Sequence, residues 1–238
     1  MNYEAVKLRA RDRVRLDKQR RPMEDRVRLV RRMAVGSDFP FERALREGSL
    51  SLLCAIEGEG TPDELLRMAR LCEEKGAAAV ALSADSDLIL QPDEGLRKIT
   101  AAVGCPILRR DTVVDAYQIY EAKLLGASAV LLIAALHTAE ELFVHIETAH
   151  QIGLSALVAV QDEREIGTAL EAGARVIGVM RPEPEESGED GLARSIRLRE
   201  YVPDRVLFVA DGGSGAPETL ATLREIGADA AWIALPIR

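Results

Sequence analysis

From residue 50 onward, short apolar runs alternate along the chain with longer stretches in which apolar residues recur at helical spacing. Runs this apolar suit parallel strands that are covered on both faces. The amphipathic stretches between them, such as residues 61–77, 115–127 and 216–228, predict helices. The apolar runs span residues 50–56, 78–83, 106–110, 129–136, 156–160, 175–180, 205–211 and 228–235.

Glycine and proline mark the ends of the predicted helices. Pro62 and Pro217 stand at or near a first helical position, where the missing N–H costs nothing. A glycine in the left-handed conformation closes several of the helices before the next strand. These glycines are Gly76, Gly126, Gly173 and Gly227.

Repeated strand–helix units joined by right-handed crossovers either close into a barrel or form an open doubly wound sheet. Eight units favour the barrel, so the sequence predicts an α/β fold of the (β/α)8 or TIM-barrel type. The strands are expected to end near Ile56, Ser83, Arg110, Leu136, Gln161, Met180, Asp211 and Leu235.

The chain is interpreted as one single domain. Residues 1–48 precede the first strand and predict one or two helices that cap the bottom of the barrel, and residues 49–238 form the barrel itself. The sequence stops at Arg238, just after the eighth strand, so the last outer helix is expected to be missing.

No segment indicates a membrane span, a secretory signal or a metal site. Hydrophobic residues make up 47% of the chain, but no apolar run approaches the roughly 18 residues that a span needs. The N-terminus lacks an apolar signal core, and the cysteines form no CxxC pair, so we expect a cytoplasmic protein with reduced, mostly buried thiols and no cofactor. The cysteines are Cys54, Cys72 and Cys105, and the histidines, with no cysteine nearby, are His137, His145 and His150.

The net charge of −8 is unevenly distributed. Residues 1–48 hold 14 Lys and Arg against 8 Asp and Glu, a charge of +6, which leaves −14 for the remainder. We interpret this segment as a solvated basic helix that docks on an acidic barrel. Nucleic-acid binding favours aromatic residues among the basic ones, and the first 33 residues offer only Tyr3, so no nucleic-acid partner is expected.

Two stretches resemble the indole-3-glycerol phosphate synthase family. Residues 106–136, PILRRDTVVDAYQIYEAKLLGASAVLLIAAL, are similar to the family's third strand through its fourth strand. Residues 157–179, LVAVQDEREIGTALEAGARVIGV, resemble its fifth strand, the following helix and its sixth strand. A thinner similarity extends from Phe41 to Leu235. The resemblance implies a (β/α)8 barrel whose active site lies at the carboxyl ends of the strands.

The positions that carry the family's chemistry differ in this chain. The Glu and Lys of its first strand correspond to Ala55 and Glu57, its catalytic Lys after the third strand to Arg110, and its fifth-strand Glu to Ala159. The residues after the last three strands also differ, and they are Met180, Arg181 and Pro182, then Asp211, Gly212 and Gly213, then Ala234, Leu235 and Pro236.

These replacements remove groups that the family's reaction needs. The reaction closes an indole ring with decarboxylation and dehydration, and it uses a cationic acid, a carboxylate and a phosphate clamp. Only five lysines are present and none falls at a predicted strand end, which also excludes a Schiff base there. We therefore expect the chain to lack indole-3-glycerol phosphate synthase activity.

The period-two alternation of strands places one set of side chains at the mouth of the barrel. Small residues among them, together with Ala55, Gly212 and Ala234, are expected to leave space in the middle. The predicted mouth contains Glu57, Ser83, Arg110, Ala159, Gln161, Met180, Asp211 and Trp232.

Four of these residues are candidates for binding or chemistry, and each also has a structural interpretation. Trp232, the only tryptophan, either fills the core or offers a stacking surface for a flat aromatic ligand. Asp211 is either a turn residue before Gly-Gly or a poorly solvated general base. Glu57 and Arg110 are expected to form an ion pair, and Arg110 can also donate a hydrogen bond to developing negative charge.

Three functions compete. The first is an engineered barrel in which a carboxylate, Asp211, abstracts a proton from a flat aromatic substrate, as in Kemp elimination. The second is a diverged natural sugar-phosphate barrel or synthase-like lyase, in which the Asp-Gly-Gly at 211–213 cradles a phosphate. The third is a non-catalytic ligand-binding scaffold. The expected partner is a small aromatic molecule, no membrane is involved, and the chain is expected to be a monomer.

Overall fold

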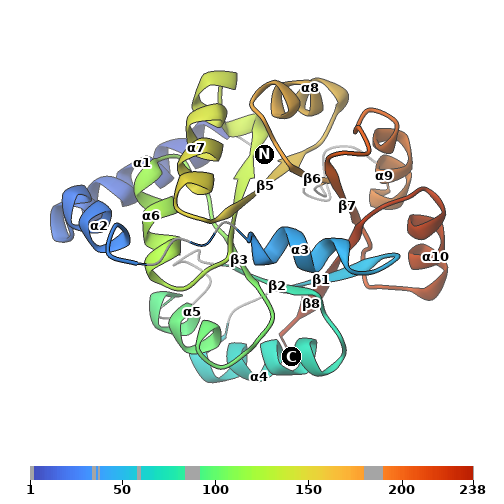
Figure 1. Cartoon of the computed structure of the whole chain (residues 1–238), viewed down its shortest axis with the longest axis horizontal. Helices are drawn as coiled ribbons and strands as arrows, with labels where there is room; N and C mark the ends of the chain where they lie inside the picture. Colours follow the sequence, from blue (N-terminus) through green and yellow to red (C-terminus); the bar gives the residue numbers. More distant parts are fainter. Residues whose placement is uncertain are drawn as a thin grey trace.

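Eight parallel strands of the described chain pair in sequence order, and the last pairs with the first to close a barrel (Figure 1). This computed structural model describes residues 3–33, 36, 38–57, 60–83, 92–179 and 190–237. Helices connect the strands on the outside, so the predicted (β/α)8 barrel is confirmed. The strands are β1 (Ser51–Glu57), β2 (Ala79–Ser83), β3 (Ile107–Arg110), β4 (Ala129–Ile133), β5 (Ser155–Val160), β6 (Val176–Val179), β7 (Leu207–Asp211) and β8 (Ala230–Pro236).

The helices fall into two groups, those before β1 and those between successive strands. The first group is α1 (Tyr3–Arg20), α2 (Met23–Val30) and α3 (Pro40–Arg46). The second group is α4 (Pro62–Glu74), α5 (Pro92–Thr100), α6 (Ala116–Leu124), α7 (Ala139–Gln151), α8 (Glu163–Glu171), α9 (Gly191–Arg199) and α10 (Pro217–Glu225).

Most strands end within one residue of the predicted position. Strand β6 is described to Val179, and its predicted end, Met180, lies outside the described residues. The predicted end of β4 at Leu136 is wrong, because the strand stops at Ile133 and a 3-10 turn, η1 (Ala134–Leu136), follows. Both Ala134 and Leu136 are buried, so the apolar character of this stretch reflects the burial of a turn.

Alternate residues of the strands fill the interior of the barrel. In an eight-stranded barrel of this type, the stagger between strands arranges them in layers of four from alternate strands. The register gives a lower layer of Leu53, Leu108, Leu157 and Val209, a middle layer of Ala81, Leu131, Gly178 and Trp232, and an upper layer of Ala55, Arg110, Ala159 and Asp211. The layers run from apolar to charged toward the carboxyl ends of the strands.

Helix α3 closes the amino-terminal end of the barrel. Figure 1 shows it lying across the ring of strands. Its Phe41 and Leu45 are 0% exposed and belong to the same buried cluster as Leu53 of β1. Burying an apolar side chain of this size contributes about 1.5–3 kcal/mol. Helix α3 therefore covers the amino-terminal end, or bottom, of the barrel.

Helix α1 lies at the opposite end of the barrel, which corrects the prediction that the whole N-terminal segment caps the bottom. Its Tyr3 hydroxyl accepts a hydrogen bond from Gln161, directly after β5. Its Arg13 donates to Asp111, directly after β3, at 2.5 Å. Because parallel strands end at the same rim, α1 spans the carboxyl rim from β5 to β3. Helix α2 then packs on α6.

Basic residues of the N-terminal segment pair with acidic residues of the barrel. This pairing agrees with the interpretation that a basic helix docks on an acidic barrel, and the acidic partners belong to α6, its N-cap and α7. Three of the pairs are Lys7–Glu141 at 2.9 Å, Lys18–Asp115 at 2.7 Å and Arg21–Glu121 at 3.8 Å.

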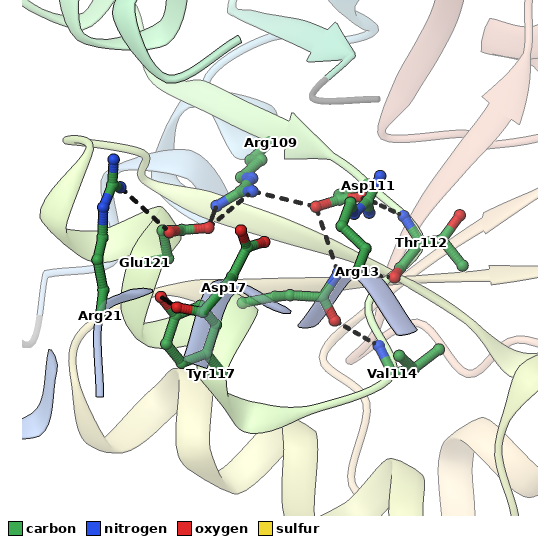
Figure 2. A network of polar contacts seen from close by, with 10 residues as sticks. Arg13, Asp17, Arg21, Arg109, Asp111, Thr112, Val114, Tyr117 and Glu121 are labelled. Atoms are coloured by element: carbon green, nitrogen blue, oxygen red, sulfur yellow. Dashed lines mark hydrogen bonds and ion pairs between the residues drawn. The ribbon is translucent and has the colours of Figure 1, made fainter. Parts of the chain in front are cut away.

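A buried polar network lies beneath α1 (Figure 2). Arg109 is 5% exposed, and its Nη2 donates to Asp111 at 3.1 Å and to Glu121 at 3.3 Å. Asp111 also accepts hydrogen bonds from Arg13 of α1 and from Gln118 of α6. Buried charges stabilise a fold only when they are paired and hydrogen-bonded. The network therefore holds α1, β3 and α6 together.

The cysteines are free, with Cys54 and Cys72 buried and Cys105 half-buried, as predicted. Within the described ranges, no helix is long and apolar enough to cross a membrane. The same residues contain no group of three His, Cys, Asp or Glu side chains that could hold a metal ion.

His145 of α7 is buried without its usual solvation. It is 7% exposed, its ring centroid lies 5.0 Å from that of His137, and its Nδ1 has no hydrogen-bond partner among the described residues. Burial, assisted by the charge of His137, lowers the pKa of His145 to about 4. The folded protein therefore keeps this histidine neutral where an unfolded chain protonates it.

The pH dependence of stability tests this burial. An unfolded histidine titrates near pH 6.5, so the stability contributed by neutral His145 is present above that pH and is lost as the pH falls toward about 4. We expect the free energy of unfolding of the His145→Gln variant to fall less steeply over this window than that of the wild type, by roughly 2–4 kcal/mol. If denaturant titrations showed the same fall of unfolding free energy with pH for the variant and the wild type, the prediction would be wrong.

The buried network provides a second prediction. The Asp111→Ala variant removes the acceptor shared by Arg13 and Arg109, and it should lose about 3–5 kcal/mol of unfolding free energy. The control is Asp25→Ala, which removes an exposed pair with Arg28 and should change stability by less than about 1 kcal/mol. Equal losses in the two variants, measured by urea unfolding, would show that the network does not hold the fold together.

Candidate functional site

Glu57 and Arg110 meet at the carboxyl rim of the barrel. Glu57 is the last residue of β1 and Arg110 the last of β3, and Arg110 Nη1 donates to Glu57 Oε1 at 2.8 Å. The side chains are 42% and 25% exposed, so the pair is accessible to solvent. The expected ion pair is confirmed.

The two consecutive arginines of β3 have opposite surroundings. Strand alternation turns Arg110 into the barrel and Arg109 outward. Arg109 is held by Asp111 and Glu121 in the network beneath α1, whereas Arg110 faces the mouth and pairs with Glu57. Arg109 therefore has a structural role, and Arg110 places a cation at the mouth of the barrel.

Trp232 lies on the interior wall of β8, one layer below Arg110. It is half-buried and packs against the interior cluster. Its own layer contains the small residues Ala81 and Gly178, and a Cβ at Gly178 would already lie 3.3 Å from Leu157 Cδ2. Leu157 therefore covers Gly178, and the packing of the Trp232 ring against the interior cluster supports the core-filling interpretation. The exposed part of the ring still forms a floor for the mouth.

The small residues of the mouth do not all line open space. Ala55 and Ala159 are 0% and 1% exposed, so neighbouring side chains cover them, and Ala234 is half-buried. The expectation that Gly212 opens the middle of the barrel is wrong. A Cβ at Gly212 would lie 2.6 Å from Ile233 Cδ1, on the outward side of β8.

Asp211 is embedded between β7 and the first turn of α9. It is 6% exposed, its Oδ1 accepts from the Gly213 N–H at 2.9 Å, and its backbone N–H donates to Ser195 Oγ at 3.0 Å. Its Oδ2 lies against Gly191, where a Cβ would approach to 2.0 Å. A substrate has little access to this carboxylate, and its role as the general base stays a prediction.

The glycines after β7 use their N–H groups within the protein. Gly212 N–H donates to the Trp232 carbonyl, Gly213 N–H to Asp211 Oδ1, and Gly215 N–H to the Gly212 carbonyl, each at 2.9 Å. A loop that cradles a phosphate needs such groups free to point at the ligand. These three donors are engaged, which weighs against the phosphate cradle expected from the Asp-Gly-Gly sequence.

The remaining predicted residues that the structure describes, Ser83 and Gln161, have different partners. Ser83 ends β2 and is the register partner of Arg110. Gln161 follows β5, and its side-chain amide donates to the Tyr3 hydroxyl. Met180 lies outside the described residues. Tyr3 was missed as a rim residue, because the sequence signals only an aromatic within a basic helix and gives no sign of which end of the barrel that helix covers.

The position of Trp232 leads to a stability prediction. If the ring fills the middle layer, Trp232→Ala should lose about 3–5 kcal/mol of unfolding free energy, as large core truncations do. The conservative Trp232→Phe variant should lose much less. A loss below about 1 kcal/mol for the alanine variant in urea unfolding would mean that the ring acts as a surface plate.

Comparison with known proteins identifies the family to which the chain is similar. A family model described as indole-3-glycerol phosphate synthase matches residues 59–235. The indole-3-glycerol phosphate synthase of Ruminiclostridium cellulolyticum is 37% identical over 204 residues, which cover 83% of this chain and 78% of that protein. That of Lachnoclostridium phytofermentans is 32% identical over 251 residues and covers 98% and 92%.

Solved structures agree on the fold. The N-acetylmannosamine-6-phosphate 2-epimerase from Clostridium perfringens superposes with a TM-score of 0.62 at 15% identity, covering 77% of this chain and 86% of that one. The sequence relatives are natural proteins, so they give no support to an engineered origin or to Kemp elimination. By sequence match and by fold, the chain belongs to the indole-3-glycerol phosphate synthase family.

Proposed function

We propose that this chain is a naturally diverged barrel of its family that binds a flat aromatic carboxylate at the mouth and acts on it by lyase-type proton transfer. The observation that carries the proposal is the ion pair between Glu57 and Arg110. In it, one guanidinium and one carboxylate stand side by side at the rim, both in reach of solvent.

The charges at the mouth indicate which chemistry is retained. By resemblance, the family has two Glu and two Lys at the positions of Ala55, Glu57, Arg110 and Ala159. At these positions this chain has one carboxylate, Glu57, and one cation, Arg110. A guanidinium stays protonated in proteins, so Arg110 binds and stabilises negative charge but does not deliver a proton. Indole ring closure needs a cationic acid, and we infer that this reaction is lost.

The ligand class follows from the donors that are accessible. A guanidinium presents its N–H groups in a planar fork that matches a carboxylate. Glu57 accepts a hydrogen bond from Nη1 of Arg110. The Arg110 side chain is 25% exposed, so a ligand can reach the guanidinium. Trp232, one layer below, offers a partly exposed ring against which a flat ligand can stack, worth about 0.5–1.5 kcal/mol beyond burial.

Family membership favours the synthase-like alternative over an engineered proton abstraction from an aromatic substrate. The proposal keeps proton transfer but moves the base from Asp211, which is 6% exposed, to Glu57, which is 42% exposed. A binding scaffold without chemistry is the competing function. It shares the binding predictions and differs only in turnover.

Binding of 2-naphthoate, a flat aromatic ring with one carboxylate, tests the proposal. Wild-type protein should prefer 2-naphthoate to its neutral analogue 2-naphthamide, and the Arg110→Met variant should lose at least about tenfold in affinity for the carboxylate, since a charge-assisted hydrogen bond contributes about 1.5–3 kcal/mol. Arg70→Met, at an exposed position of α4, is the matched control and should bind like the wild type. An unchanged preference in Arg110→Met, measured by calorimetry, would refute the proposed ligand class.

Turnover separates an enzyme from a scaffold. With a benzisoxazole that carries a carboxylate as the proton donor, Glu57→Gln should slow ring opening by about 10²–10⁴-fold if Glu57 is the base, whereas Asp211→Asn should retain most of the activity. No ring opening by the folded wild type would leave the scaffold function in place of the enzyme. Formation of indole-3-glycerol phosphate from the family's substrate, well above background, would contradict the inferred loss of ring closure.

A further inference from the structure

The three cysteines of the chain converge on one buried cluster from three different parts of the fold. Cys54 lies on β1, Cys72 on α4, and Cys105 in the turn between α5 and β3. Cys54 and Cys72 belong to the apolar cluster between α4 and the outer faces of β1 and β2, and Cys105 packs against it. The fold therefore gathers every thiol of the chain in one place, and the proposed function uses none of them.

Cys54 and Cys72 contact each other directly. The Cys72 thiol donates a hydrogen bond to the Cys54 sulfur. The two residues are 7% and 2% exposed, so the packing around them keeps the sulfurs together. A disulfide requires that the two sulfurs approach closely. This pair meets that requirement, and a bond between them would join β1 to α4.

The hydrogen bond makes the two sulfurs chemically different. It stabilises negative charge on Cys54 and so lowers the pKa of that thiol, and the same bond, together with burial, raises the pKa of Cys72. The thiolate is the form of cysteine that attacks oxidants. Cys54 is therefore the nucleophile of the pair, and Cys72 is placed to complete a disulfide with it.

Cys105 is more exposed than the other two cysteines and less reactive than Cys54. Burial, assisted by the charge of Glu73, raises the pKa of Cys105 to about 11, so the thiol stays protonated near neutral pH. Glu73 of α4 also accepts hydrogen bonds from the backbone N–H groups of Gly104 at 2.6 Å and Cys105 at 3.0 Å. These bonds hold the turn against α4, and Cys105 provides a comparison thiol within the same cluster.

We propose that Cys54 and Cys72 form a modification site that hydrogen peroxide, a small uncharged oxidant, converts to a disulfide. The Cys54 thiolate attacks one peroxide oxygen, the O–O bond breaks, and the products are a sulfenic acid on Cys54 and one water. The Cys72 sulfur then attacks the Cys54 sulfur. The S–S bond forms as the S–O bond breaks, and the hydroxyl leaves with the Cys72 proton as a second water. The two thiols together lose two electrons, which the peroxide gains.

Peptide mapping of the whole chain after treatment with hydrogen peroxide tests the proposal. In the wild type, the peptide that contains Cys54 should become linked to the peptide that contains Cys72, while Cys105 stays available for alkylation after unfolding. The thermal unfolding midpoint should rise by roughly 5–10 °C, because the bond restricts the unfolded chain, and dithiothreitol should reverse the rise. A linked peptide that contains Cys105, or a Cys54 and Cys72 that stay reduced while Cys105 is oxidised, would overturn the proposal.

Two matched variants separate the roles of the thiols. Cys105→Ala should form the same disulfide as the wild type and show the same rise in midpoint. Cys72→Ala should stop at the sulfenic acid of Cys54, which dimedone traps, and its midpoint should not rise. Loss of the disulfide in a folded Cys105→Ala variant, or a Cys54 that dimedone does not label in a folded Cys72→Ala variant, would also overturn the proposal. The wild-type peptide map decides the question if either variant does not fold.

Discussion

A closed ring of parallel strands directs every second side chain into one narrow interior, and the rest of the structure depends on how that interior is filled. Leu53, Leu108 and Leu157 pack the lower layer, and Phe41 of α3 closes the amino-terminal end beneath them. Trp232 adds the largest side chain of the middle layer, where it packs against the interior cluster. In the three interior layers of the described strands, the charged residues lie in the upper layer near the carboxyl rim, where backbone ends and solvent can satisfy them.

Local patterns in the sequence predicted the fold and one part of the site. Apolar runs and helix-ending glycines indicate eight strand–helix units, and alternation along β1 and β3 predicts that Glu57 and Arg110 face each other. The apolar run gave the wrong end for β4, because a buried turn is as apolar as a strand. Position along a strand predicts which way a side chain points, but not what approaches it from elsewhere.

The features that the sequence did not predict are contacts between distant segments. The charge imbalance predicted that α1 docks on the barrel, but the end it covers depends on Asp111 in the loop after β3 and on Glu141 in the first turn of α7. Asp211 was expected to be poorly solvated beside Trp232, and it is buried. Its carboxylate also lies against Gly191 and its backbone N–H donates to Ser195, both of α9, and no local pattern connects these residues to it.

A crystal structure of the protein with 2-naphthoate tests the proposed function most directly, because the ligand's carboxylate is expected to bind to Arg110. We predict that the carboxylate lies about 2.7–3.2 Å from the guanidinium nitrogens of Arg110, with the aromatic ring against Trp232 and Asp211 unmoved. A carboxylate bound at the glycine loop after β7, with Asp211 displaced from Gly191, would contradict the account.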